Sequence, residues 1–246
     1  MSEIIREEKN MRRPGGELAN RPLHFFWVVD CSGSMYGEKI GTLNHAIQET
    51  ISEMVDAAAD NPNAQLLVRT LQFSTGASWV TSTSVPVEEY SWEDLEADGV
   101  TDLGKAFELL AAQLSVEQLG ERALPPVVVL LSDGQPTDDY KKQLDKLKHQ
   151  PWGKKAVKIA ISIGQDADDK VLTEFTGNKE MVLQANNASS LTKMIKWAST
   201  VASVVSAPAS RVGIDDSGNN PGGSGAPAIF DMNDLPDPDG VSGGVW

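Results

Sequence analysis

The sequence predicts an α/β fold: a doubly wound, mostly parallel sheet with one antiparallel edge strand and helices on both faces. Short apolar runs alternate along the chain with segments whose apolar residues recur at helical spacing. This alternation is typical of parallel strands joined by helical crossovers. One pair of predicted strands is separated only by Ser74-Thr75-Gly76. So short a connection predicts a hairpin, which places a single antiparallel strand at an edge of the sheet.

The strands are predicted from apolar composition. The run from Leu23 to Val29 is nearly continuous, and Val127 to Leu131 is the clearest apolar segment of the chain. Such runs suit strands that are buried on both faces of a parallel sheet. The remaining strands are predicted at residues 66–73, 77–81, 157–163 and 181–184.

The helices are predicted from spacing. Between Lys39 and Ala59, apolar residues such as Ile40, Leu43 and Ile47 recur every three or four positions, which gives a helix one apolar face. Further helices are predicted at residues 102–114, 138–148, 170–176 and 189–205.

The chain has 246 residues, which is enough for one α/β domain with tails. Residues 1–20 are charged and predicted to form an N-terminal arm, and residues 21–206 to form the domain. Residues 207–246 contain eight Gly, five Pro, six Asp and a single Arg. This segment has no apolar periodicity, so we expect a disordered acidic tail.

Composition excludes several functional classes. The net charge of −14 argues against nucleic acid as a partner, because phosphate backbones demand basic patches. The single cysteine, Cys31, allows neither an internal disulfide nor a cysteine-based zinc site. No stretch reaches the roughly 18 apolar residues of a membrane span, and residues 1–20 lack the apolar run of a secretory signal. We therefore expect a cytoplasmic protein that binds neither membranes nor nucleic acid.

Three loops carry oxygen donors where a doubly wound sheet forms its sites, outside the carboxyl ends of the strands. Asp30, Ser32 and Ser34 follow the first strand, Thr101 opens the second helix, and Asp133 follows the clearest strand. Carboxylates and hydroxyls are hard ligands that suit Mg²⁺ or Mn²⁺ and not copper or zinc. The sequence thus predicts a metal site at this edge.

The spacing within these loops has a physical reason. Ser32 and Ser34 are alternate residues, so their hydroxyls can face one point if the loop curls, and Gly33 permits a tight turn between them. Gly134 is expected to do the same after Asp133. Two carboxylates leave a divalent cation under-neutralised, so we expect an open coordination position that takes a carboxylate from a partner protein.

The stretch from Val28 to Met35 resembles the DxSxS signature of von Willebrand factor A domains. Val100 to Gly104 resembles the threonine element of their metal-ion-dependent adhesion site (MIDAS), and Leu131 to Gly134 the later aspartate element. The resemblance covers about residues 21–205; Cys31 departs from it at a position that is not a ligand. It implies that hydroxyls contact the metal and that the carboxylates act directly or through water, with the ligand set Asp30, Ser32, Ser34, Thr101 and Asp133.

A narrower resemblance points to bacterial TerY-type proteins. Met11 to Pro14, Gly37 to Ile40 and Ile163 to Asp168 are similar to segments of those cytoplasmic proteins. The resemblance implies an adaptor in tellurite-resistance or stress-response systems, with a Ser/Thr kinase and a PP2C-type phosphatase as partners.

Two other functions stay open at this point. The first is a metal-dependent phosphotransferase or hydrolase, which would also need a general base or a second metal and phosphate-binding cations; near the three loops the sequence offers only Lys39 and Lys105. The second is an accessory subunit of an AAA+ ATPase, as in chelatase-like complexes. No phosphate-binding loop motif is present, and Cys31 has no identifiable base. We therefore expect a binding module and not an enzyme.

Overall fold

A computed structural model describes residues 20–61, 64–133, 135–165 and 167–206. The tail predicted for residues 207–246 lies outside these ranges, as does the arm predicted for 1–20 apart from residue 20, so both stay predictions. Within the ranges given, no helix combines the length and the apolar composition that a membrane crossing requires.

Strands and helices alternate along the described chain. The strands are β1 (Arg21–Asp30), β2 (Ala64–Ser74), β3 (Gly76–Trp79), β4 (Val85–Pro86), β5 (Val127–Ser132), β6 (Val157–Ile163) and β7 (Val182–Ala185). The α-helices are α1 (Glu38–Ala59), α2 (Leu103–Gln113), α3 (Val116–Leu119), α4 (Lys141–His149), α5 (Pro151–Lys155), α6 (Asp169–Thr176) and α7 (Ala188–Ser206). Single 3-10 turns are η1 (Gly33–Met35), η2 (Val87–Glu89) and η3 (Lys179–Met181).

One mixed sheet runs through the domain in the order β3-β2-β1-β5-β6-β7. Its strands pair in parallel from β2 to β7, whereas β3 pairs antiparallel with β2 at the edge. The two-residue β4 also pairs antiparallel with β2, further along that strand. The predicted doubly wound sheet with an antiparallel edge strand is therefore confirmed, and β4 is a small addition to it.

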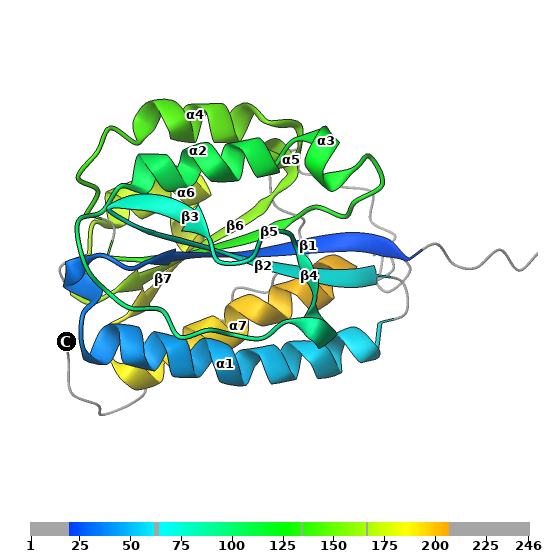
Figure 1. Cartoon of the computed structure of the whole chain (residues 1–246), viewed down its shortest axis with the longest axis horizontal. Helices are drawn as coiled ribbons and strands as arrows, with labels where there is room; N and C mark the ends of the chain where they lie inside the picture. Colours follow the sequence, from blue (N-terminus) through cyan, green and yellow to red (C-terminus); the bar gives the residue numbers. More distant parts are fainter. Residues whose placement is uncertain (1–19, 62–63, 134, 166, 207–246) are drawn as a thin grey trace, which may run out of the picture.

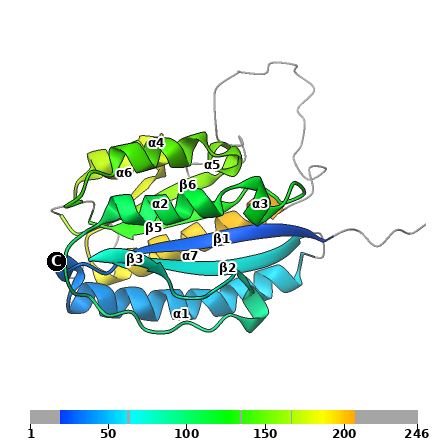
Figure 2. The same cartoon turned by 45° about the horizontal axis from the view of Figure 1, so that its top comes forward.

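Helices cover both faces of this sheet (Figure 1). The long helices α1 and α7 lie side by side on one face, and α2, α4 and α6 lie on the other, together with the short α3 and α5. The turned view shows the same three layers (Figure 2). Because β1, β2, β5, β6 and β7 are parallel, their carboxyl ends share one edge of the domain, and the three predicted loops lie there.

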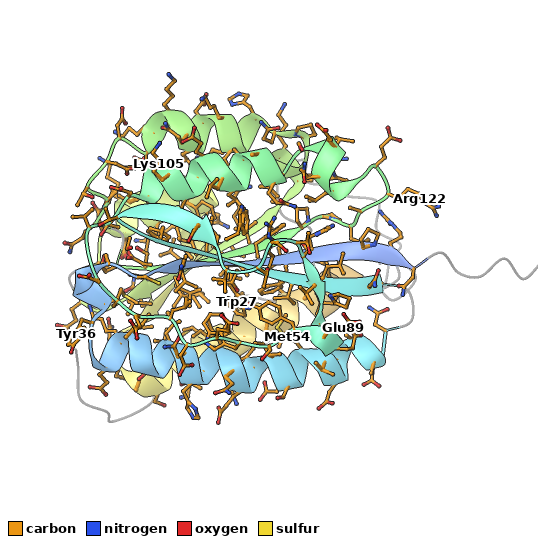
Figure 3. All side chains as sticks on the ribbon, in the orientation of Figure 1. Trp27, Tyr36, Met54, Glu89, Lys105 and Arg122 are labelled. Atoms are coloured by element: carbon orange, nitrogen blue, oxygen red, sulfur yellow. The ribbon has the colours of Figure 1, made fainter. Side chains whose placement is uncertain are left out.

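The core has two halves, one on each side of the sheet. Along β1, Phe25 and Trp27 pack toward α1 and α7, whereas Phe26 and Val28 pack toward α2 and α4. All four side chains are fully buried, which explains why the sequence of this strand is apolar without alternation. Figure 3 shows Trp27 and Met54 between the sheet and α1.

Some boundaries differ from the prediction for local reasons. Helix α4 begins at Lys141 and not at Asp138, because the Asp138 carboxylate accepts a hydrogen bond from the Gly104 amide (3.0 Å) and so fixes the start of α2. The edge strand ends at Trp79, because buried Arg69 draws the next turn inward through hydrogen bonds to two of its carbonyl groups. Helices α3 and α5 were not predicted, since four or five residues are too few to show a helical period.

Candidate metal centre

The ends of β1 and β5 bring two of the predicted loops together. These strands are parallel neighbours with Val29 opposite Leu131, so Asp30 and Ser132 end side by side. The Ser132 hydroxyl donates a hydrogen bond of 2.5 Å to the Asp30 carboxylate, and Asp133 follows directly. Ser132 was not among the predicted site residues, although its position directly before Asp133 in the sequence could have indicated it.

The loop after β1 curls as its spacing predicts. The Ser32 amide donates to the Asp30 carboxylate (2.9 Å), which turns the chain back over the strand end. The hydroxyls of Ser32 and Ser34 then lie 3.0 Å apart and hydrogen-bond to each other. Met35 is fully buried and anchors the 3-10 turn to the core. Two hydroxyls and one carboxylate therefore come from a single short loop.

The segment that carries Thr101 is held by backbone hydrogen bonds to the loop after β1 and to the loop after β5. The Gly33 amide donates to the carbonyl of Gly99 (3.0 Å), which lies two residues before Thr101. Thr101 and Thr137 pair twice: the Thr101 amide donates to the Thr137 hydroxyl (3.1 Å), and the Thr137 amide donates to the Thr101 carbonyl (2.8 Å). The loop that begins at Asp133 is thereby held against the segment that carries Thr101.

Gly33 has a different role from the one predicted. Its φ is not positive, so the turn does not need the conformational freedom of glycine. A side chain would instead press on the neighbouring loop, because a Cβ at Gly33 would lie 3.3 Å from the Gly99 carbonyl oxygen. Gly99 does need that freedom, with φ of 80°, and a Cβ there would lie 2.4 Å from the Thr75 hydroxyl. Gly134 lies outside the described residues.

The carboxylates of the site are buried without a basic partner. Asp30 is fully buried and Asp133 is 3% exposed. Burial raises the pKa of Asp30 to about 6, hydrogen bonds from Ser132 and Ser32 oppose the shift, and the negative charge of Asp133 adds to it. Among the ion pairs of the described chain, none involves Asp30 or Asp133. Buried carboxylates that repel each other call for a cation between or beside them.

The donor set fits a hard divalent cation. It consists of two carboxylates and three hydroxyls, all oxygen ligands of the kind that Mg²⁺ and Mn²⁺ prefer. The Thr101 side chain is buried, and its hydroxyl makes no hydrogen bond to any residue that the structure describes. In that same part of the chain, no three His, Cys, Asp or Glu side chains gather, so the site is not an acidic cage.

The residue that follows Asp30 carries a buried thiol with a raised pKa. Cys31 is buried at 4% exposure, and burial together with the charge of Asp30 raises the pKa of its thiol to about 12. A thiol with this pKa holds its proton at neutral pH, which disfavours the thiolate that a nucleophile requires. Its amide and carbonyl are used structurally, in bonds to Phe73 and Asp98.

Two apolar side chains at this edge were missed by the sequence interpretation. Tyr36 is 80% exposed and Val100 is 45% exposed, whereas nearly all other large apolar residues of the described chain are covered. Tyr36 lies one turn beyond Gly33, and Val100 directly precedes Thr101. Figure 3 shows Tyr36 at the outer end of the domain. The tryptophans Trp79, Trp92, Trp152 and Trp197 are, by contrast, buried or half-buried.

A sequence model of the von Willebrand factor type A domain matches residues 26–197 of the chain. No curated protein sequence matches this chain. Among solved structures, the pilus adhesin SpaC from Lactobacillus rhamnosus GG in its open conformation superposes with a TM-score of 0.61 at 14% identity, over 75% of this chain and 30% of the adhesin.

Two further structures superpose on the same part of the chain. A von Willebrand factor type A protein from Catenulispora acidiphila gives a TM-score of 0.54 at 14% identity, over 75% of this chain and 43% of that one. Proximal thread matrix protein 1 from the mussel byssus, with a zinc-occupied MIDAS motif, gives 0.54 at 19% identity, over 75% and 48%. This chain thus spans less than half of each of these three proteins, and at such identities the likeness concerns the fold.

Proposed function

We propose a function from one premise: this chain belongs to the von Willebrand factor type A domain family, whose model matches residues 26–197. The proposed function is that of a non-catalytic protein-binding module. Its MIDAS would hold one divalent cation through the side chains of Asp30, Ser32, Ser34, Thr101 and Asp133, and the cation would complete its coordination with a carboxylate of the partner.

The observation that carries the proposal is the buried charge at the end of β1. Asp30 has no exposed surface, lies beside Asp133 and has no ion-pair partner in the described chain. A bound cation supplies the missing positive charge. Because the protein contributes only two carboxylates, the ion keeps a net positive charge and attracts a third carboxylate from outside.

The surface around the site supports a protein as the partner. Tyr36 and Val100 belong to the two loops that meet through the Gly33–Gly99 hydrogen bond. Exposed aromatic and aliphatic side chains around a buried polar centre are typical of contact surfaces between proteins. Mg²⁺ or Mn²⁺ is the proposed cation, since the donors are all oxygen atoms.

The geometry gives little support to an enzyme. Lys105, one of the two lysines that the sequence places near the metal loops, pairs with Glu108 on its own helix (3.3 Å). The histidines are engaged elsewhere: His45 and His149 pair with carboxylates on their own helices, and burial lowers the pKa of His24 to about 4. No observation in the fold favours an AAA+ accessory subunit over other partners.

The finer proposal is an adaptor in a bacterial stress-response or phospho-signalling system. It rests on the TerY-type segments of the sequence, of which Gly37 to Ile40 forms the start of α1 beside the site. A Ser/Thr kinase and a PP2C-type phosphatase are the proposed partners, and the cytoplasm is the proposed location.

A pull-down with the full chain tests this function. With Mg²⁺ present, we expect a kinase or a phosphatase to bind and to be released by EDTA, because the metal bridges the two proteins. Tyr36→Ala should weaken the complex about tenfold, in the range for an exposed aromatic anchor. Val116→Ala is the matched control, since Val116 is 38% exposed but lies on α3. Recovery of the same partners with and without EDTA contradicts the metal bridge.

A further inference from the structure

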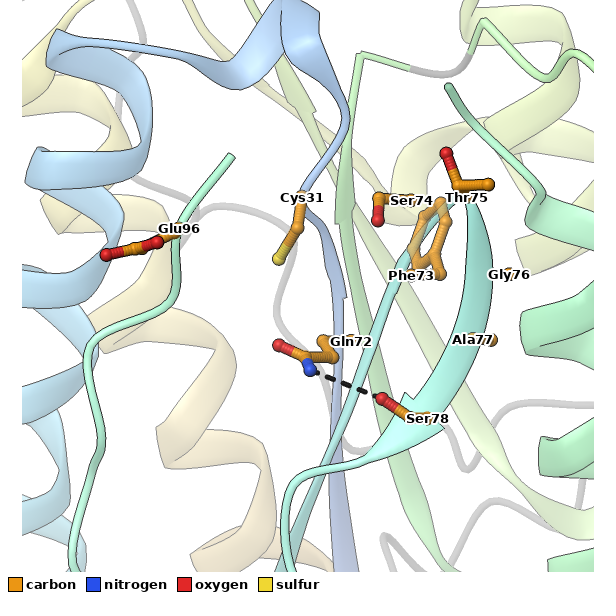
Figure 4. A pocket seen from close by; sticks show the side chains of 9 residues that line it. All are labelled: Cys31, Gln72, Phe73, Ser74, Thr75, Gly76, Ala77, Ser78 and Glu96. Atoms are coloured by element: carbon orange, nitrogen blue, oxygen red, sulfur yellow. Dashed lines mark hydrogen bonds between the residues drawn. The ribbon is translucent and has the colours of Figure 1, made fainter. Parts of the chain in front are cut away.

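A pocket opens beside the metal loops, on the side of the antiparallel edge strand (Figure 4). Its volume is about 420 Å³, and its walls come from the end of β2, from β3 and from the segment that carries Glu96. Cys31 also lines it, so the pocket shares a residue with the loop that follows Asp30. It is nevertheless a separate cavity, because none of the five proposed metal ligands lines it.

The lining is rich in hydrogen-bond acceptors and has one charge. Gln72, Ser74, Thr75 and Ser78 contribute an amide and three hydroxyls. Glu96 stands at the opposite wall, and its exposed carboxylate is directed away from Gln72 in Figure 4. The amide nitrogen of Gln72 donates to the Ser78 hydroxyl (3.2 Å), which leaves the amide oxygen directed toward the side where Glu96 lies (Figure 4). None of the lining residues is basic.

The segment that supplies most of the pocket walls carries no positive charge. Between Arg69 and Lys105 the sequence contains no Lys, Arg or His, and seven of its residues are acidic. Glu96 is exposed and takes part in none of the ion pairs found in the described chain. A cationic group that enters the pocket therefore meets a carboxylate and neutral acceptors, and no competing cation from these walls.

We propose that this pocket binds a lysine or arginine side chain of the protein partner, with its cationic group at Glu96. An arginine fits best, because its guanidinium carries five donors for the acceptors of the pocket, whereas a lysine ammonium carries three. The small residues Gly76 and Ala77 leave room for the long side chain. The inference rests on the proposed function, because the same partner is taken to reach the metal.

The two subsites are close enough for one short segment of a partner. The Asp98 amide donates to the Cys31 carbonyl (2.8 Å), so Glu96 is two residues from a direct contact with the metal loop. Two residues of chain span at most about 7 Å. A partner segment that places an Asp or Glu at the cation can therefore place a Lys or Arg a few positions away in the pocket. The recognised feature is an acidic residue followed or preceded at short distance by a basic one.

Selection of random 12-residue peptides on the immobilised full chain tests the proposal. The probes are the displayed peptides, with Mn²⁺ or EDTA in separate arms. From wild type with Mn²⁺ we expect enrichment of an acidic residue together with Lys or Arg. Peptides selected on Glu96→Gln should still contain the acidic residue, but their enrichment in Lys or Arg should fall at least threefold. Peptides selected on Glu96→Lys should carry an acidic residue where the wild-type peptides carry Lys or Arg. Glu117→Gln, an exposed change on α3, is the matched control and should behave as wild type.

Binding of one selected peptide then separates the pocket from the metal. Glu96→Gln should weaken it about three- to fivefold, the upper range for an exposed ion pair. Replacing the basic residue of the peptide by alanine should weaken its binding to wild type by the same factor. The same replacement should not weaken binding to Glu96→Gln any further. Equal basic enrichment in wild type and Glu96→Gln overturns the pocket proposal. Basic enrichment that depends on Glu96 but not on Mn²⁺ supports the pocket and contradicts the metal bridge, so the two failures are distinguishable.

Discussion

Asp30→Asn is expected to abolish the binding of Mg²⁺ and Mn²⁺ and, at the same time, to stabilise the metal-free domain. The loss of binding follows from charge, because one of only two carboxylates in the proposed ligand set disappears. We expect at least a hundredfold weaker affinity, since the remaining donors do not offset the hydration of a divalent ion. The gain in stability follows from burial, because the ionised group has no positive partner in the described chain.

The sign of the pH dependence can be stated. Burial raises the pKa of Asp30 from its ordinary value of 3.8 to about 6 in the folded state. An acid whose pKa is raised by folding holds its proton more tightly in the folded state. The metal-free domain therefore loses stability as the pH rises from about 4 to about 6, and the loss amounts to about 3 kcal/mol at neutral pH. Asp30→Asn should remove most of that loss.

Calorimetric titration with Mn²⁺ measures the loss of metal binding. Urea unfolding of the metal-free protein at pH 5 and pH 7.5 measures the change in stability. Mn²⁺ should raise the unfolding temperature of wild type and leave that of Asp30→Asn unchanged. Asp56→Asn removes an exposed carboxylate from α1 and serves as the control, with wild-type behaviour expected in both assays. If Asp30→Asn binds Mn²⁺ with wild-type affinity, the assignment of the site is wrong.

Much of this edge of the domain could be predicted, because the carboxyl ends of parallel strands lie together at one edge of their sheet. Apolar runs locate β1 and β5, and their carboxyl ends must meet if they are parallel neighbours. Asp30 and Asp133 could therefore be placed together from the sequence alone. The 3.0 Å contact between the hydroxyls of Ser32 and Ser34 was foreseeable from their alternate spacing.

What could not be predicted depends on irregular backbone. The segment from Tyr90 to Asp102 has no helix or strand, so it shows no period that a pattern can detect. Its buried residues Trp92 and Leu95 stand among acidic residues and resemble a surface loop in the sequence. The pocket at Glu96 and the close approach of Gly33 to Gly99 both arise from where this segment lies. Both features depend on how closely loops from distant parts of the sequence approach each other, and no single stretch of sequence shows this.

Asn44 on α1 holds this irregular segment in place. Its amide oxygen accepts hydrogen bonds from the Leu95 amide (3.0 Å) and the Trp92 indole (3.2 Å), and its amide nitrogen donates to the Leu95 carbonyl (2.9 Å). Both the donor and the acceptor of the side chain are used, and Asn44 is buried. The segment continues from Leu95 to Asp98 and Gly99, whose backbone groups bind the metal loop. Asn44 is therefore a positioning residue for Thr101.

Asn44→Ala is expected to lower the free energy of unfolding by about 3 kcal/mol, because it leaves three buried polar groups without partners. It should also weaken Mn²⁺ binding about tenfold, since the segment that carries Thr101 is no longer fixed. Leu147→Ala is the matched control: Leu147 is fully buried on α4, and its truncation should cost about 2–5 kcal/mol. Mn²⁺ titration of both folded variants separates general destabilisation from positioning. A similar loss of affinity in both variants, or in neither, means that Asn44 contributes to the fold and not to the site. A loss confined to Asn44→Ala shows that a residue on the face of α1 sets the geometry of the metal loops through a segment with no regular structure.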